Sequence, residues 1–412
     1  MLILKISNIQ LYRKLHTYII GFQKSKIVSM DLFDLKNRIY IGPPTHNENS
    51  YDYYDRSSRK DVSNMRNILN KWFHDYPESE REELKKRFKK TFSSTFYELF
   101  IYELFKHQGF EITIHPTVPN SSKKPDFFIK KGDFEFYLEA KESNAKSQEQ
   151  QAMKNRINQV YDSINTIESP NFFLNIEELI LKTTKQPSVK GAIKRIQKEI
   201  SDYDPDEITN QIQKFGIDIS PHINIEDTEL KLTISLIPKD PPYRYNDFTP
   251  IGIYPFESFW GGAEESIKSS FIRKANRYGK LDKPYIICIN SIGSRFTGDY
   301  DVGNAIWGSF AFSWSNDPDN RDEKLIRLKN GLFLNTKGPT FQNVNGILIT
   351  YVMEFNIPVS RYWFVKHPYP NQILSFDIFD MAYQYVKDRT ILTNPGKSIG
   401  EILRIGTNWL NL

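Results

Sequence analysis

Residues Ser94–Ser143 read STFYELFIYELFKHQGFEITIHPTVPNSSKKPDFFIKKGDFEFYLEAKES, and this stretch decides the fold. Within it, two runs of alternating apolar and polar residues, Asp126–Lys131 and Phe134–Lys141, flank Gly132-Asp133. This pattern predicts a β-hairpin with a two-residue turn, because glycine tolerates the positive φ that such a turn needs. The turn fixes the register, so that Asp126 lies opposite Glu139.

The register sorts the hairpin side chains into two faces. One face is apolar and is expected to enter the core: Phe127, Ile129, Phe134, Phe136 and Leu138. On the other face Lys130 lies opposite Glu135, which is a favourable cross-strand pair. Asp126 and Glu139 on that face are a like-charge pair, which is destabilising without a cation between them. Because Mg²⁺ prefers carboxylate oxygens and keeps bound waters, we expect Mg²⁺ there, with Lys141 within reach on the same face.

A helix is expected to precede the hairpin. Ser93 or Ser94 can cap its start, and Gly109 ends it. The segment is apolar nearly all round, which predicts a largely buried helix interrupted by Glu98 and Glu103. A buried carboxylate needs a partner, so we expect one of these glutamates to face the metal and the other to face solvent or a basic neighbour.

A helix glutamate, then Pro125-Asp126, then Glu139-Ala140-Lys141 at the end of a strand resembles the PD-(D/E)XK phosphodiesterase superfamily, which has the restriction-endonuclease-like fold. The resemblance covers roughly Ser94–Ile176. It implies an α/β protein with a mixed sheet core flanked by helices. It also implies that Asp126, Glu139, Glu98 and the backbone carbonyl of Ala140 bind Mg²⁺, for which Mn²⁺ can substitute. Lys141 would then orient or activate the attacking water and steady the phosphate.

The remaining chain extends this core. A helix over Gln148–Ile167 and a strand over Phe172–Ile176 are expected to complete an α-β-β-β-α-β order. Pro284–Asn290 reads as a buried parallel strand, and the basic segment Ala263–Tyr278 reads as a helix before it. Further elements are expected after residue 291: strands over Ala305–Trp314, Gly331–Leu334 and Gly346–Met353, and helices over Asp377–Lys387 and Ser398–Ile405.

Three parts of the chain follow from this assignment. Residues 1–60 form an N-terminal extension, in which Met30 is an alternative start. Residues 61–290 form the nuclease-like domain. Residues 291–412 form a C-terminal α+β region that either recognises substrate or packs on the first domain.

Basic residues on two expected helices are candidates for nucleic-acid contact. The segment 182–198 holds six lysines and arginines and no acid. The candidates are Lys154, Arg156, Lys190, Lys194 and Arg195. Ordinary solvation of these faces is the alternative interpretation.

The composition agrees with a soluble globular protein of 412 residues and net charge +5, which is compatible with nucleic-acid binding. The single cysteine, Cys288, lies in an apolar run, so disulfide frameworks and cysteine zinc sites are excluded. No apolar run has the ~20 residues of a membrane span, and no signal peptide is apparent, so we expect a cytoplasmic protein.

These observations together predict a Mg²⁺-dependent endonuclease acting on DNA, and the resemblance suggests restriction or host defence. Such an enzyme could work as a homodimer or with a partner protein. The alternatives are an ordinary hairpin with surface charges, an inactive nucleic-acid-binding or assembly protein on the same fold, and a nuclease acting on RNA or branched DNA.

Overall fold

The computed structural model describes residues 30–119, 121–143, 148–246, 248–255, 262–292, 297–315 and 322–411. The segment before Met30 lies outside the described residues, so the expectations about the start of the chain are not addressed by it. None of the helices in the described ranges is both long and apolar enough to span a bilayer.

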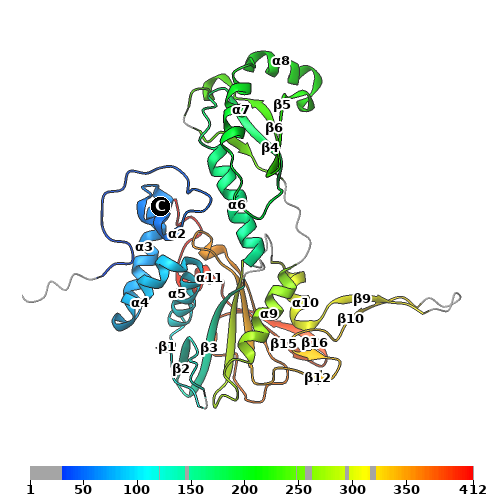
Figure 1. Cartoon of the computed structure of the whole chain (residues 1–412). Helices are drawn as coiled ribbons and strands as arrows, with labels where there is room; N and C mark the ends of the chain where they lie inside the picture. The colour runs from blue at the N-terminus through cyan, green and yellow to red at the C-terminus, as the bar shows by residue number, and fades with distance from the viewer. Residues whose placement is uncertain are drawn as a thin grey trace, which may run out of the picture.

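An eight-stranded mixed sheet forms the body of the molecule, in the order β1-β2-β3-β8-β13-β14-β15-β16 (Figure 1). The central strands β3, β8 and β13 are parallel to one another, whereas β1 and β2 add on antiparallel at one side. The bounds are β1 Glu111–Ile114, β2 Phe127–Lys131, β3 Phe134–Ser143, β8 Tyr285–Ser291, β13 Gly346–Tyr351, β14 Arg361–Lys366, β15 Tyr383–Lys387 and β16 Thr390–Asn394. The expected α/β class with a large mixed sheet is therefore confirmed.

Helices cover both faces of this sheet. On one face α5 (Phe92–Lys106) packs against Phe136, Leu138 and Cys288, together with α2 (Ser50–Arg56), α3 (Lys60–Asp75), α4 (Glu78–Lys90) and α11 (Ile399–Leu403). On the other face α9 (Ala263–Ala275) and α10 (Asp299–Trp307) cover Tyr137 and Ile287. All seven residues of β8 are buried because both faces of this central strand are covered.

The hairpin of β2 and β3 has the predicted register. Lys131 pairs with Phe134 and Lys130 with Glu135, around Gly132, whose φ is +59°. Four of the five residues of the predicted apolar face are buried, but Phe134 is 40% exposed, so that part of the prediction is wrong. Phe134 directly follows the turn, where the hairpin extends past its helix cover.

A second sheet, β5-β6-β4-β7, forms a separate lobe over residues 148–255, here called the inserted lobe. It consists of α6 (Gln148–Ile164), β4 (Phe172–Leu181), α7 (Lys190–Ile200), α8 (Pro205–Phe215), β5 (His222–Glu226), β6 (Leu230–Pro238) and β7 (Ile251–Ile253), with short 3₁₀ turns at Ile217–Ile219 and Pro241–Tyr243. It has its own apolar core, and α6 leads into it from the body (Figure 1). The strand expected at Phe172–Ile176 exists, but its expected place in the main sheet is wrong, because β8 pairs with β3 instead.

The chain leaves and rejoins the body at one place. Ser143 ends β3 just before the inserted lobe, and Ser266 lies in the first turn of α9 just after it. The two hydroxyls share a hydrogen bond, and Ser270 Oγ donates to Ser143 Oγ at 3.1 Å. All three serines are buried, so the two ends of the insertion are held together in the interior.

Residues after 291 contribute β13 to β16 to the main sheet. They also form a projecting ribbon of β9 (Phe310–Ser313) and β10 (Lys324–Arg327), the short pair β11 (Leu334–Asn335) and β12 (Gly338–Pro339), and a 3₁₀ turn at Ile357–Val359. The strand predicted over Ala305–Trp314 is wrong in its first half, where α10 continues to Trp307.

The helix predicted over Asp377–Lys387 is also wrong. Positive φ angles at Asp388 and Arg389 close a hairpin turn, and β15 and β16 pair across it. The helix predicted at Ser398–Ile405 is confirmed as α11, with Ser398 and Glu401 forming a capping box.

Candidate active site

Asp126 reaches across to the strand that bears Glu139. It directly precedes β2, and its Oδ2 accepts a hydrogen bond from the backbone N–H of Ala140 at 2.7 Å. Burial, and the negative charges of Glu139 and Glu98, raise the pKa of Asp126 well above its ordinary value. The structure thus brings together the like-charge pair that the hairpin register predicts.

Glu139 is 1% exposed, and both of its carboxylate oxygens are occupied. Lys274 of α9 donates to Oε1, and the hydroxyl of Tyr278 donates to Oε2. Lys274 is itself largely buried, and the Tyr278 hydroxyl also lies 3.1 Å from the carbonyl oxygen of Lys124. Burial and the charge of Glu139 raise the pKa of Tyr278 far above its ordinary value, so it stays a hydrogen-bond donor at neutral pH.

Glu98 lies on α5, and its carboxylate is bound by a guanidinium group and a hydroxyl group from residues that precede α5 in the chain. Arg87 of α4 binds both of its oxygens, with Nη2 at 2.8 Å from Oε1, and the hydroxyl of Tyr76 donates to Oε1 at 3.1 Å. Its charge still acts on Asp126, as the pKa of that group shows. Within the described ranges, no group of three His, Cys, Asp or Glu side chains is arranged to hold a metal ion.

Glu103, the second glutamate of α5, lies away from this cluster. Its side chain is fully buried, its two oxygens have no hydrogen-bond partner, and the nearest base is His107 at 3.4 Å. Burial raises the pKa of Glu103 to about 8.

Lys141 is half-buried on the same face of β3 as Glu139. Burial lowers the pKa of Lys141 below its ordinary value, and the positive charges of Lys274 and Arg273 lower it further. Lys274 and Arg273 therefore lie near Lys141, and Lys274 also contacts Glu139. Ala140 is fixed by its N–H bond to Asp126, while the role of its carbonyl as a ligand stays a prediction.

The chemistry of the donors fits one hard cation held by two carboxylates. Asp126 and Glu139 would hold Mg²⁺, which commonly uses one or two protein carboxylates and keeps several waters. Glu98 is engaged by Arg87, so the third carboxylate of the expected set is not free in this arrangement.

Lys274 and Tyr278 are the site residues that the sequence analysis missed. Lys274 is part of the expected basic helix, but nothing in that pattern assigns it to Glu139, which lies 135 residues earlier. The available signal is that Lys274 and Tyr278 are four residues apart at the end of the expected basic helix, just before a buried parallel strand, although α9 itself ends at Ala275.

The five basic residues proposed to contact nucleic acid all lie in the inserted lobe. Lys154 and Arg156 lie on α6, whereas Lys190, Lys194 and Arg195 lie on α7. Arg156 is half-buried and Arg195 pairs with Glu199 at 2.6 Å. Lys154, Lys190 and Lys194 are exposed.

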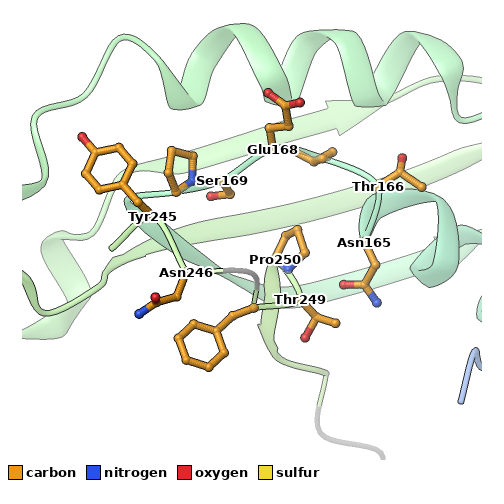
Figure 2. Close-up of a pocket in the computed structure, with 11 residues that line it drawn as sticks. Asn165, Thr166, Glu168, Ser169, Tyr245, Asn246, Thr249 and Pro250 are labelled. Atoms are coloured by element: carbon orange, nitrogen blue, oxygen red, sulfur yellow. The ribbon is translucent and has the colours of Figure 1, made fainter. Parts of the chain in front are cut away.

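A hollow of about 510 Å³ also lies in the inserted lobe, between the loop that follows α6 and a second segment that includes Tyr245, Asn246 and Pro250 (Figure 2). Figure 2 shows Tyr245 and Asn246 on one side of it and Thr166 and Glu168 on the other. Among the described residues that line it, Glu168 is the only charged one, and these residues form no group of acids and bases like the Asp126–Glu139 cluster.

Comparison of the chain with protein-family models, curated proteins and solved structures found no match. Function is therefore inferred from the geometry of the site.

Proposed function

We propose that this protein is a Mg²⁺-dependent phosphodiesterase that cuts DNA as an endonuclease. The observation that carries the proposal is the meeting of Asp126, just before β2, with Glu139 of the adjacent strand β3, with Lys141 and Lys274 beside them. A buried acid with a raised pKa, such as Asp126, next to partly buried lysines is an arrangement typical of functional sites.

The order of the elements supports assignment to the restriction-endonuclease-like fold. With the inserted lobe set aside, the chain runs α5, β1, β2, β3, α9 and β8, with β8 parallel to β3. This is the α-β-β-β-α-β order expected from the PD-(D/E)XK resemblance, completed by α9 and β8 rather than by α6 and β4. The inferred role in restriction or host defence depends on the resemblance alone.

Each residue has a role in this proposal. Asp126 and Glu139 would hold Mg²⁺, which when bound polarises the phosphate and lowers the pKa of water. Lys141, half-buried beside them, places positive charge where negative charge develops on the phosphate. The backbone N–H of Ala140 orients Asp126.

Nicking of supercoiled plasmid in Mg²⁺ tests the proposal. We expect Asp126→Asn and Lys141→Ala to lower the nicking rate about 10²-fold or more, as loss of one transition-state contact typically does. Lys130→Ala is the matched control, since Lys130 lies on the same hairpin but pairs with Glu135 at 3.8 Å. Equal activity in all four proteins would overturn the assignment of the site.

One observation favours a second function, an inactive nucleic-acid-binding or assembly protein. Both oxygens of Glu139 already have protein partners, which an inactive site would keep permanently. DNA binding without nicking in Mg²⁺ or Mn²⁺ would establish that function. Parallel RNA and branched-DNA substrates would identify a different nuclease specificity.

One active site cuts one strand. Double-strand cleavage therefore requires two chains or two successive nicks, and the order of reaction in protein concentration separates these routes.

A further inference from the structure

The ammonium group of Lys274 lies against a carboxylate that is expected to bind the metal ion. It contacts Oε1 of Glu139, a carboxylate that is 1% exposed and lies beside a second acid, Asp126. A buried carboxylate needs a positive partner, and within the described residues Lys274 is the cation bonded to it.

We propose that Lys274 is an internal counter-ion of the metal site, which neutralises Glu139 until a divalent cation displaces it. The inference rests on the proposed function, because it concerns the same two carboxylates. The metal must break the Lys274–Glu139 ion pair, so its measured affinity is lowered by the free energy of that pair.

Lysine suits such an exchange. Its charge is carried on a flexible four-carbon stem, whereas the planar fork of arginine would bind the carboxylate through two bonds and hold it more firmly. Tyr278 donates to the other oxygen and keeps the carboxylate oriented while Lys274 moves.

The displaced ammonium would remain near other cations. Lys141 lies near it, since the charge of Lys274 lowers the pKa of Lys141, and Arg273 directly precedes Lys274 on α9 and acts on Lys141 in the same way. Such a cluster of three cations suits the negative charge of a phosphate, so Lys274 would exchange a carboxylate partner for a phosphate partner when metal and substrate enter.

Mn²⁺ binding measured by calorimetry and by thermal unfolding of the full chain tests the proposal without requiring activity. We expect Lys274→Met to unfold at a lower temperature than wild type without metal, because it leaves Glu139 buried and unpaired. We expect the same variant to bind Mn²⁺ at least tenfold more tightly, and to recover its unfolding temperature when Mn²⁺ is added. Adding Glu139→Gln should abolish the gain in affinity.

Two further variants make the test specific. Lys274→Arg is conservative enough to fold and should bind Mn²⁺ more weakly than wild type. Lys268→Met is the matched control on the same helix, because Lys268 pairs with Glu264 at 2.6 Å rather than with the site, and it should bind Mn²⁺ as wild type does. Unchanged or weaker Mn²⁺ binding by Lys274→Met would overturn the proposal, as would unchanged binding by Lys274→Arg.

The two proposals can fail separately. Tighter Mn²⁺ binding by Lys274→Met, with no nicking by the wild type, would support the counter-ion and refute the phosphodiesterase. Plasmid nicking by the wild type, with equal Mn²⁺ affinities in all variants, would support the phosphodiesterase and refute the counter-ion.

Discussion

Arg87 binds both carboxylate oxygens of Glu98, and this ion pair joins two consecutive helices, α4 and α5, at the edge of the candidate site. The Glu98 side chain is only 10% exposed, and Tyr76 donates to it as well. The pair therefore has a structural function that is independent of any metal.

Arg87→Ala is expected to destabilise the fold, because it leaves the charge of Glu98 buried without its cation. We expect a loss of about 2–4 kcal/mol in the free energy of unfolding, somewhat below the usual cost for a fully buried pair because Arg87 is partly exposed. Urea denaturation measures this loss. The double variant Arg87→Leu with Glu98→Leu should recover part of it, and a double variant less stable than Arg87→Ala would contradict the interpretation.

The stability of the protein should depend on pH through Glu103. Burial raises the pKa of Glu103 in the folded protein to about 8, from an ordinary value of 4.5. The folded state therefore binds the proton of the Glu103 carboxyl more tightly than the unfolded state does. The resulting contribution to the free energy of unfolding is fully present below about pH 4.5 and is lost as pH rises through about 8. Glu103→Gln removes this dependence.

Urea denaturation between pH 5 and pH 8.5 measures the effect. We expect the stability of Glu103→Gln relative to wild type to rise across this range by a few kcal/mol, on the order of 3. The control is Glu111→Gln, since Glu111 is exposed on β1. Parallel pH profiles for wild type and Glu103→Gln would show that Glu103 is not buried as described.

Gly132 and Gly191 provide a matched pair for testing the hairpin turn. A Cβ atom would meet nothing within 4 Å at either position, but only Gly132 has a positive φ, +59°. Gly132→Ala should therefore cost about 1 kcal/mol, while Gly191→Ala, in helix α7, should stabilise by a similar amount. Thermal unfolding distinguishes them, and equal effects would argue against the predicted turn.

The exposed lysines of α7 should contribute to DNA binding through phosphate contacts. Replacing Lys190 and Lys194 together by Gln should weaken binding and lower the slope of log affinity against log salt by up to about 2. Lys231→Gln is the control in the same lobe, because Lys231 already pairs with Glu178 at 2.6 Å. An unchanged salt slope in the double variant would remove α7 from the DNA interface.

The hairpin and its acids could be predicted because their determinants are local. Alternation and Gly132-Asp133 specify the register, and the register places Asp126 beside Glu139. The buried parallel strand at Tyr285–Ser291 could likewise be recognised from its continuous apolar run.

The neighbour of β3 could not be predicted, because a strand pattern does not say which sheet the strand joins. The strands predicted at Phe172–Ile176 and Pro284–Asn290 both follow a predicted helix, and only the pairing shows that the first belongs to the inserted lobe. Lys274 was missed for the same reason, since its contact with Glu139 depends on how α9 returns to the sheet.

The buried contact of Ser143 with Ser266 and Ser270 brings the two ends of the inserted lobe together, and the lobe touches the body again where Asp162 and Asn155 of α6 bind His46 and Asn47. An insertion whose two ends meet can be removed, exchanged or enlarged without changing the pairing of the surrounding strands. The chain thus consists of a body, built on the main sheet, and an inserted lobe that the body holds at both ends. A change confined to the inserted lobe would therefore leave Asp126, Glu139, Lys141 and Lys274 in place, because all four belong to the body.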